Sequence, residues 1–399
     1  MQLHDPVRQV SFIQQALSQN RKPIAFFIGA GCPLSVRVEE TVNGETMNRP
    51  LIQDVSGLTT TIADALKSKE EGKPSTWDKI VEVAEEDGTD TKNIELLLSK
   101  IRQLSGVAGK GLVRGLSADE LDKLDDQICS VISDQVDREL PHRDTAYHNL
   151  AIWARSIRRA QPVHLFTTNY DLLLEQALEE SSAPYFDGFV GTRRAFFDLG
   201  AVEDEDLLPP RWSRLWKIHG SLNWRLDANG AVVRSNEKTG ARSYLIYPSH
   251  LKYDQSRKMP YLAMLDRLKS FLLKPSALLF VCGYSFADEH INDVICRSLE
   301  TNSTAQAFAF MYGKLDEPKY EYGRRCAFST PNLSMLGFDK AIIGRNHGEW
   351  RGDGADELEL PQNVIVSDGA TVSVRLGDFA ALGNLLRGLA GEQEQSDEA

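Results

Sequence analysis

Short, continuous apolar runs recur along the chain and alternate with stretches whose apolar residues repeat at helical spacing. The four strongest runs are 24–28, 162–168, 215–219 and 277–282. Their length and aromatic content favour buried strands over helices. Because helical patterns separate them, we predict an α/β fold: a Rossmann-like, mostly parallel sheet with helices on both faces.

The rest of the pattern divides the chain into further parts. Residues 58–140 are charged and helical in pattern, so we predict a helical insertion. Positions 345–363, rich in Gly and Asp, predict a loop, and a helix over 379–389 is expected to close the fold. The predicted parts are a main domain of 1–57 with 141–315, the insertion 58–140, a small C-terminal segment 316–390 and a disordered tail 391–399.

Composition narrows the class of protein. The chain has 399 residues, 42% of them hydrophobic, and lacks the run of about 18 apolar residues that a membrane helix needs. No basic stretch followed by an apolar run opens it, so we expect a cytoplasmic protein without membrane contact. A net charge of −12 argues against direct binding of nucleic acid.

The cysteines argue against a metal site. There are five, widely scattered, and no Cys-x-x-Cys pair occurs among them. Neither a zinc ribbon nor a disulfide framework is therefore supported, and we expect no metal.

Each strong run is followed by a loop of polar or glycine residues. The loops are 29–32, 168–171, 219–221 and 283–285. Parallel strands bring their carboxyl ends to one edge of a sheet, where ligands of open α/β folds bind. Glycines at such a place let backbone amides approach a pyrophosphate.

Taken singly, each loop also has an ordinary structural interpretation. The Gly-x-Gly of the first loop fits a tight turn equally well, and Asn169 fits the N-cap of the helix that follows. His219 fits a buried core histidine, and Ser285 a simple side-chain turn. Asp288 fits a helix cap.

Taken together and in this order, the loops resemble those of the sirtuin family, an NAD⁺-binding α/β fold. The likeness spans residues 20 to 312. The segments that carry it are Gly29-Ala30-Gly31 with Ser35, Thr168-Asn169-Tyr170-Asp171, His219-Gly220 and Gly283-Tyr284-Ser285.

Two departures separate the chain from the protein-deacylating branch of that family. That branch carries four zinc-binding cysteines between the histidine and the late glycine loop, whereas residues 220–281 contain none. Thr168 also stands where that branch has Gln, and a Pro-Asp-Phe-Arg stretch is missing. The run 283–292 resembles instead bacterial sirtuin-like effectors of antiphage defence, which destroy NAD⁺.

The resemblance implies an NAD⁺ hydrolase that releases nicotinamide and ADP-ribose, with NAD⁺ as its substrate. Asn169 and His219 would be catalytic, Asn169 holding the water or a ribose hydroxyl and His219 acting as general base. Asp171 would bind the nicotinamide carboxamide. The other residues implied to bind the dinucleotide are Gly29, Ala30, Gly31, Ser35, Thr168, Gly283 and Ser285.

The same resemblance implies partners. We expect a homo-oligomer controlled by a separate HerA-type hexameric ATPase, with an argonaute-like protein as the alternative. Two other functions stay open: a non-catalytic NAD⁺ or ADP-ribose sensor, and a deacylase or ADP-ribosyltransferase that consumes NAD⁺ only with an acceptor.

Overall fold

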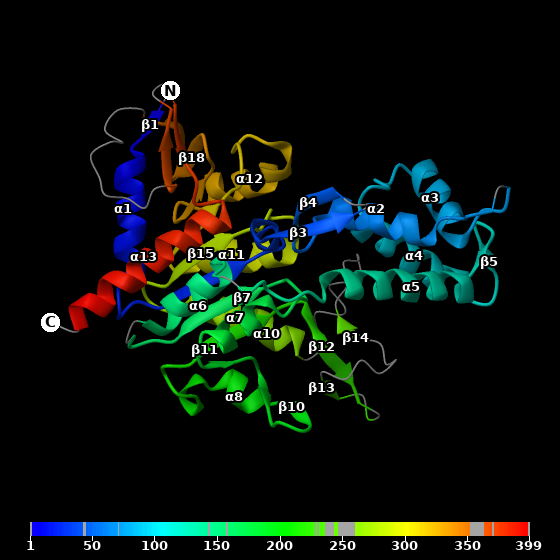
Figure 1. The fold of residues 1–399 in the computed structure, drawn as a ribbon, viewed down its shortest axis with the longest axis horizontal. Helices are drawn as coiled ribbons and strands as arrows, with labels where there is room; N and C mark the ends of the chain where they lie inside the picture. The colour runs from blue at the N-terminus through cyan, green and yellow to red at the C-terminus, as the bar shows by residue number, and fades with distance from the viewer. Residues whose placement is uncertain are drawn as a thin grey trace.

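The computed structural model describes most of the chain. The described residues are 2–42, 45–70, 72–142, 144–156, 159–227, 229, 231–235, 243–245, 260–351, 363–368 and 371–397. A ten-stranded sheet forms its centre (Figure 1). In spatial order its strands are β1 (Gln2–His4), β19 (Asn346–Trp350), β18 (Lys340–Ile343), β17 (Leu333–Leu336), β16 (Gln306–Phe310), β15 (Leu278–Cys282), β2 (Ile24–Ile28), β7 (Val163–Thr167), β11 (Ser213–Lys217) and β8 (Tyr185–Phe186).

The sheet is mostly parallel, as the alternating pattern predicts. All pairs from β17 across to β8 run parallel, and only β18 pairs antiparallel with both of its neighbours. In register, Ile28 of β2 lies between Thr167 of β7 and Cys282 of β15. The carboxyl ends of β7, β2 and β15 are therefore aligned at the same edge of the sheet.

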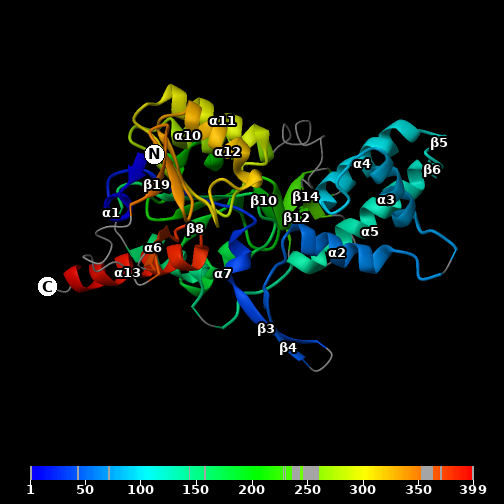
Figure 2. The same ribbon diagram turned by 90° about the horizontal axis from the view of Figure 1, so that it is seen from above.

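Helices cover both faces, which confirms the predicted α/β class. Alternate residues of β2 point to opposite sides, with Phe26 in one apolar cluster and Phe27 in the other. The helices that contribute to the first cluster include α1 (Pro6–Leu17), α6 (Ala146–Ser156) and α13 (Phe379–Asp397), and those of the second include α10 (Tyr261–Leu272), α11 (Glu289–Thr301) and α12 (Glu321–Ser329). Figure 2 shows these two groups on opposite sides.

Residues 58–140 form mostly helices, with a short hairpin of β5 (Leu112–Val113) and β6 (Leu116–Ser117), and lie to one side of the central sheet (Figure 1). The helices are α2 (Val55–Leu66), α3 (Thr76–Glu86), α4 (Ile94–Ala108) and α5 (Ala118–Val136). Ser117 and Glu120 close a capping box at the start of α5. The buried side chains of this block are continuous with the apolar cluster on the α1 face.

The described fold also contains smaller elements. β3 (Arg37–Val42) and β4 (Glu45–Pro50) form an antiparallel hairpin after β2. A second sheet has the order β14 (Ser243–Leu245), β12 (Gly220–Leu226), β13 (Val232–Arg234), β10 (Ala195–Phe197) and β9 (Phe189–Val190). No helix in the described part of the chain is long and apolar enough to cross a membrane.

The C-terminal segment differs from the prediction in two respects. The expected loop 345–363 is wrong at its start, because Asn346–Trp350 forms β19 and pairs with both β18 and β1. Residues 352–362 lie outside the described residues. α13 continues to Asp397, so the backbone of the expected tail 391–399 is helical that far.

The segment 316–390 is also part of the main architecture. Three of its strands extend the central sheet, and α13 packs on α6, where the rings of Tyr147 and Phe379 lie 5.0 Å apart. The sheet thus draws its strands from both ends of the chain.

Candidate functional site

The four predicted loops follow four neighbouring strands. The central part of the sheet has the order β15, β2, β7, β11, and all four strands are parallel. Their carboxyl ends therefore lie side by side, as the sequence predicts, at the edge where open α/β sheets bind ligands.

The glycine loop after β2 is bonded to the loop after β15. The amide of Gly29 donates to the carbonyl of Cys282 at 2.9 Å, and that of Gly31 donates to the carbonyl of Gly283 at 2.8 Å. A Cβ on Gly29 would lie 2.3 Å from the carbonyl oxygen of Gly283. Close packing of the two loops thus requires glycine at position 29.

These hydrogen bonds reduce the number of backbone amides in the glycine loop that are available to bind a pyrophosphate. The amides of Gly29 and Gly31 already have carbonyl partners, whereas Ala30 is exposed at the tip of the loop. Ser35 donates to the carbonyl of Cys32 at 2.8 Å. The dinucleotide-binding roles of all four residues stay predictions, and Ala30 is the one placed most openly.

The Gly283→Ala variant is expected to be destabilised by at least about 2 kcal/mol, since strain and overpacking both oppose the new methyl group. Gly283 has a φ of +69°, and a Cβ there would lie 2.6 Å from both N and Sγ of Cys32. Gly344→Ala is the matched control, with a φ of +56° and open space around its Cβ. Equal losses for the two variants in urea unfolding would show that loop packing contributes nothing beyond strain.

Asn169 connects the second loop to the first. Its Nδ2 donates to the carbonyl of Gly29 at 3.2 Å, and its backbone amide donates to Oγ1 of Thr167 at 3.0 Å. It is not an N-cap, because α7 (Leu173–Glu180) has Leu172 at that position. The capping interpretation of Asn169 is therefore wrong.

The amide oxygen of Asn169 is one of the buried, unpartnered polar atoms of this site, along with Oγ of Ser221 and Oε2 of Glu175. Oδ1 is buried and has no hydrogen-bond partner among the described residues. Buried polar atoms are nearly always hydrogen-bonded, so an unpaired one indicates a water or a ligand. The neighbouring Thr168 is half-buried at the end of β7.

Buried charges lie beneath this loop. Lys217, at the end of β11, donates to the backbone carbonyl of Asp171 and, at 2.9 Å, to Oε1 of Glu175 on α7. Burial raises the pKa of the Asp171 carboxyl, and the positive charge of Lys217 opposes that shift. The same two effects act on the pKa of Glu175.

Neither Lys217 nor Glu175 was predicted from the sequence as part of the site. A signal was present, because Lys217 interrupts the apolar run 215–219 at a position where a strand buried on both faces has no room for an unpaired charge. A buried lysine in such a run predicts a carboxylate partner, although the sequence does not say which one.

His219 faces a carboxylate. Its Nε2 lies 3.3 Å from Oδ2 of Asp288, and the exposed fractions of the two side chains are 12% and 11%. Asp288 is the N-cap of α11, as expected, with Oδ1 accepting from the amides of His290 and Ile291. The third and fourth loops are therefore in contact through side chains.

The fourth loop is firmly folded. The hydroxyl of Tyr284 donates to Oδ1 of Asn292 at 2.8 Å, and Nδ2 of Asn292 donates to the carbonyl of Phe286 at 2.7 Å. Phe286 is buried with a φ of +60°, a strained conformation for a residue with a side chain. Ser285, between them, is half-buried. Strain of this kind often accompanies functional loops.

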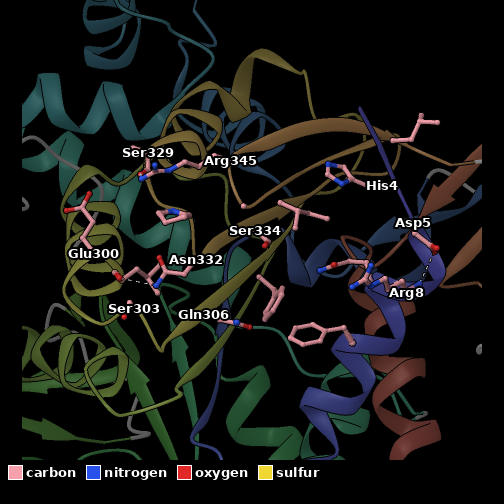
Figure 3. Close-up of a pocket in the computed structure, with 18 residues that line it drawn as sticks. His4, Asp5, Arg8, Glu300, Ser303, Gln306, Ser329, Asn332, Ser334 and Arg345 are labelled. Carbon is pink, nitrogen blue, oxygen red and sulfur yellow. Dashed lines mark hydrogen bonds between the residues drawn. The ribbon is translucent and has the colours of Figure 1, made fainter. Parts of the chain in front are cut away.

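A separate cavity of about 1020 Å³ lies elsewhere, and Figure 3 shows its lining. It adjoins the amino end of β16, at Gln306, the residues before β17, at Asn332, and the start of α1, at Arg8. None of the residues of the four loops lines it. The candidate site is therefore defined by the contacts between loops.

The described residues contain no cluster of His, Cys, Asp or Glu that could hold a metal ion. All five cysteines are free, and two of them, Cys32 and Cys282, are buried behind the glycine loop. Burial raises the pKa of the Cys32 thiol well above its usual range, so this thiol stays protonated.

Comparison with known proteins gives one sequence match and several fold-level similarities. Residues 163–328 match the family model described as the SIR2-like domain. None of the curated protein sequences matches this chain.

Several solved structures similar to the chain are Sir2 proteins. A structure from work on the mechanism and regulation of Sir2 enzymes has 10% identity and a TM-score of 0.39, covering 99% of this chain and 100% of that one. A Sir2 homologue in complex with NAD has 12% identity and a TM-score of 0.36, covering 97% and 94%. A mutant Sir2 homologue with ADP-ribose has 10% identity and a TM-score of 0.35, covering 97% of each. Over residues 163–328, this chain is therefore similar in sequence to the SIR2-like domain.

Proposed function

We propose that this chain hydrolyses NAD⁺ to nicotinamide and ADP-ribose at the loops after β2, β7, β11 and β15. The observation that carries the proposal is the buried, unpartnered Oδ1 of Asn169. This acceptor lies in the loop that is bonded to the glycine loop. A water or a ribose hydroxyl supplies the missing donor.

Hydrolysis of NAD⁺ requires few catalytic groups from the protein. Cleavage passes through an oxocarbenium-like state in which the bond between ribose C1′ and nicotinamide breaks. The electron pair of that bond leaves on the nicotinamide nitrogen, so the leaving group is neutral and needs no acid. A water oxygen bonds to C1′, and the water loses its proton to a general base.

His219 is the base in this proposal. Imidazole takes up protons near neutral pH, which suits general-base catalysis. Its fixed partner Asp288 is an anion that stabilises the imidazolium formed. Asn169 Oδ1 would orient the water or a ribose hydroxyl, and Asp171 would accept from the carboxamide of nicotinamide.

One feature of the sequence supports hydrolysis over deacylation. The segment 220–281 carries none of the four cysteines of the deacylating branch.

The experiment follows nicotinamide release from NAD⁺ by the purified chain, with and without an acylated peptide. Release without the peptide, together with ADP-ribose, is the expected result. Release only with the peptide would support a deacylase or ADP-ribosyltransferase instead. Tight NAD⁺ binding with no release under any condition would support a sensor.

We also propose that this activity serves bacterial antiphage defence by depleting NAD⁺ in the cytoplasm, as the likeness of the run 283–292 suggests. The chain would act as a homo-oligomer with a HerA-type hexameric ATPase. Light scattering of the chain alone and with that ATPase tests this arrangement. A stable complex with an argonaute-like protein, and none with the ATPase, would favour the alternative partner.

A further inference from the structure

We propose that Asp288 is the positioning residue of His219: it fixes the imidazole with its hydrogen on Nε2 and so makes Nδ1 the proton-accepting atom. The inference deepens the proposed function, because its kinetic consequence requires NAD⁺ cleavage. The placement of the hydrogen is independent of that activity.

The contact itself sets the tautomer. A carboxylate has no hydrogen to donate, and Oδ2 of Asp288 lies 3.3 Å from Nε2 of His219. A hydrogen on Nε2 makes this contact attractive, whereas a lone pair there would face an anion. Neutral imidazole carries one hydrogen, so Nδ1 is then the basic nitrogen.

Asp288 is held in place by its other bonds. Its Oδ1 accepts from the amides of His290 at 3.0 Å and Ile291 at 3.3 Å, which fixes the carboxylate at the start of α11. Its backbone carbonyl lies 3.2 Å from the hydroxyl of Tyr284, which shares its one hydrogen between this carbonyl and Oδ1 of Asn292. The other carboxylate oxygen, Oδ2, is the one that faces Nε2 of His219.

The His219–Asp288 pair is more deeply buried than a similar His–Asp pair on the surface. His347 and Asp316 have a similar distance of 3.4 Å, but their side chains are 36% and 48% exposed. The side chains of His219 and Asp288 are 12% and 11% exposed, so water screens their interaction much less.

The proton balance follows from this arrangement. Nδ1 takes the proton that the attacking water loses, and Nε2 keeps its hydrogen on Asp288. The resulting imidazolium lies against the carboxylate, and the proton later leaves to solvent. Asp288 itself never exchanges a proton and touches no reacting atom.

Asp288 both caps α11 and contacts His219, and substitutions can remove the contact while keeping the cap. Serine and asparagine are as good N-caps as aspartate, so Asp288→Ser and Asp288→Asn keep α11 capped. Asp288→Ser removes the contact with His219, and Asp288→Asn directs a donor at Nε2 and favours the opposite tautomer. Asp54, which caps α2 with Oδ1 2.8 Å from the amide of Gly57, provides the control Asp54→Ser.

The kinetic expectation is a fall in kcat of at least about tenfold in both Asp288 variants, with KM nearly unchanged. Asp54→Ser should keep the wild-type kcat. Wild-type kcat in Asp288→Ser and Asp288→Asn, in a wild-type protein shown to cleave NAD⁺, would overturn the positioning role.

A second measurement needs no activity. In ¹⁵N-histidine spectra, with the His219 signals assigned by their loss in His219→Gln, the wild-type ring should carry its hydrogen on Nε2. Asp288→Asn should move the hydrogen to Nδ1. A wild-type ring with hydrogen on Nδ1, or an unchanged tautomer in Asp288→Asn, would overturn the inference. Inactivity of the wild-type protein would refute the proposed function alone, because the tautomer is still measured.

Discussion

His219→Ala is expected to lower the rate of NAD⁺ cleavage by about 10²- to 10⁴-fold, the usual contribution of a general base. The variant loses the group that accepts the proton of the attacking water, and it leaves Asp288 without the imidazole. The measurement is kcat for nicotinamide release. NAD⁺ affinity, measured by calorimetry, should change far less.

The control for this variant is His347→Ala. His347 also faces an aspartate, at 3.4 Å, but on the surface and away from the four loops. Its removal should leave kcat at the wild-type value. A His219→Ala protein that is folded and cleaves NAD⁺ as fast as the control would remove His219 from the mechanism.

Lys217→Met is expected to destabilise the fold by about 3–5 kcal/mol, the cost of leaving buried charge without its partner. The lysine side chain is 2% exposed and that of Glu175 10%, so water does not replace the lost cation. Burial already raises the pKa of Asp171 and Glu175, and loss of the lysine raises both further. Carboxyl groups whose pKa is raised bind more protons in the folded state than in the unfolded state. The loss of unfolding free energy in Lys217→Met, relative to the wild type, should therefore shrink as the pH falls toward about 5.

The free energy of unfolding in urea measures this effect. Lys340→Met is the matched control, because Lys340 lies 2.8 Å from Asp316 in a pair that is 22% and 48% exposed. Pairs of that kind contribute less than about 1 kcal/mol. Similar losses for the two variants, or a deficit in Lys217→Met that grows as the pH falls, would contradict the account of the buried charges.

The sequence was sufficient to predict the sheet centre and the placement of the loops. Apolar runs mark β2, β7, β11 and β15 to within two residues at each end, and parallel strands bring their carboxyl ends together whatever the details of the loops. Strand β19 was missed, because Asn346 and its exposed neighbours lack an apolar run and pair at the margin of the sheet. β19 is not the edge strand, because β1 pairs with it on the outer side, but only Gly348 and Trp350 of β19 are buried, which leaves little periodic signal.

The contacts within the site could not be predicted. His219 and Asp288 are far apart in the chain, and a cap signature at Asp288 explains only one of its two oxygens. In the glycine loop, the sequence pattern suggested a role that the tertiary hydrogen bonds do not match. Its Gly-x-Gly suggested open amides, whereas the amide of Gly29 donates to Cys282 at the end of β15 and that of Gly31 donates to Gly283 in the loop that follows. Local sequence patterns indicate which hydrogen bonds a residue can make. Which partner it bonds to depends on the tertiary fold.

The central claim is that Asn169 and its neighbouring loops bring a water to NAD⁺. Cleavage in H₂¹⁸O, followed by mass spectrometry of the ADP-ribose, tests it most directly. The wild-type chain should release nicotinamide and place one ¹⁸O in ADP-ribose, and Asn169→Ala, which removes the buried amide oxygen, should lose nearly all of that product. Labelled ADP-ribose formed equally fast by Asn169→Ala, or nicotinamide released with no ¹⁸O incorporated, would contradict the account.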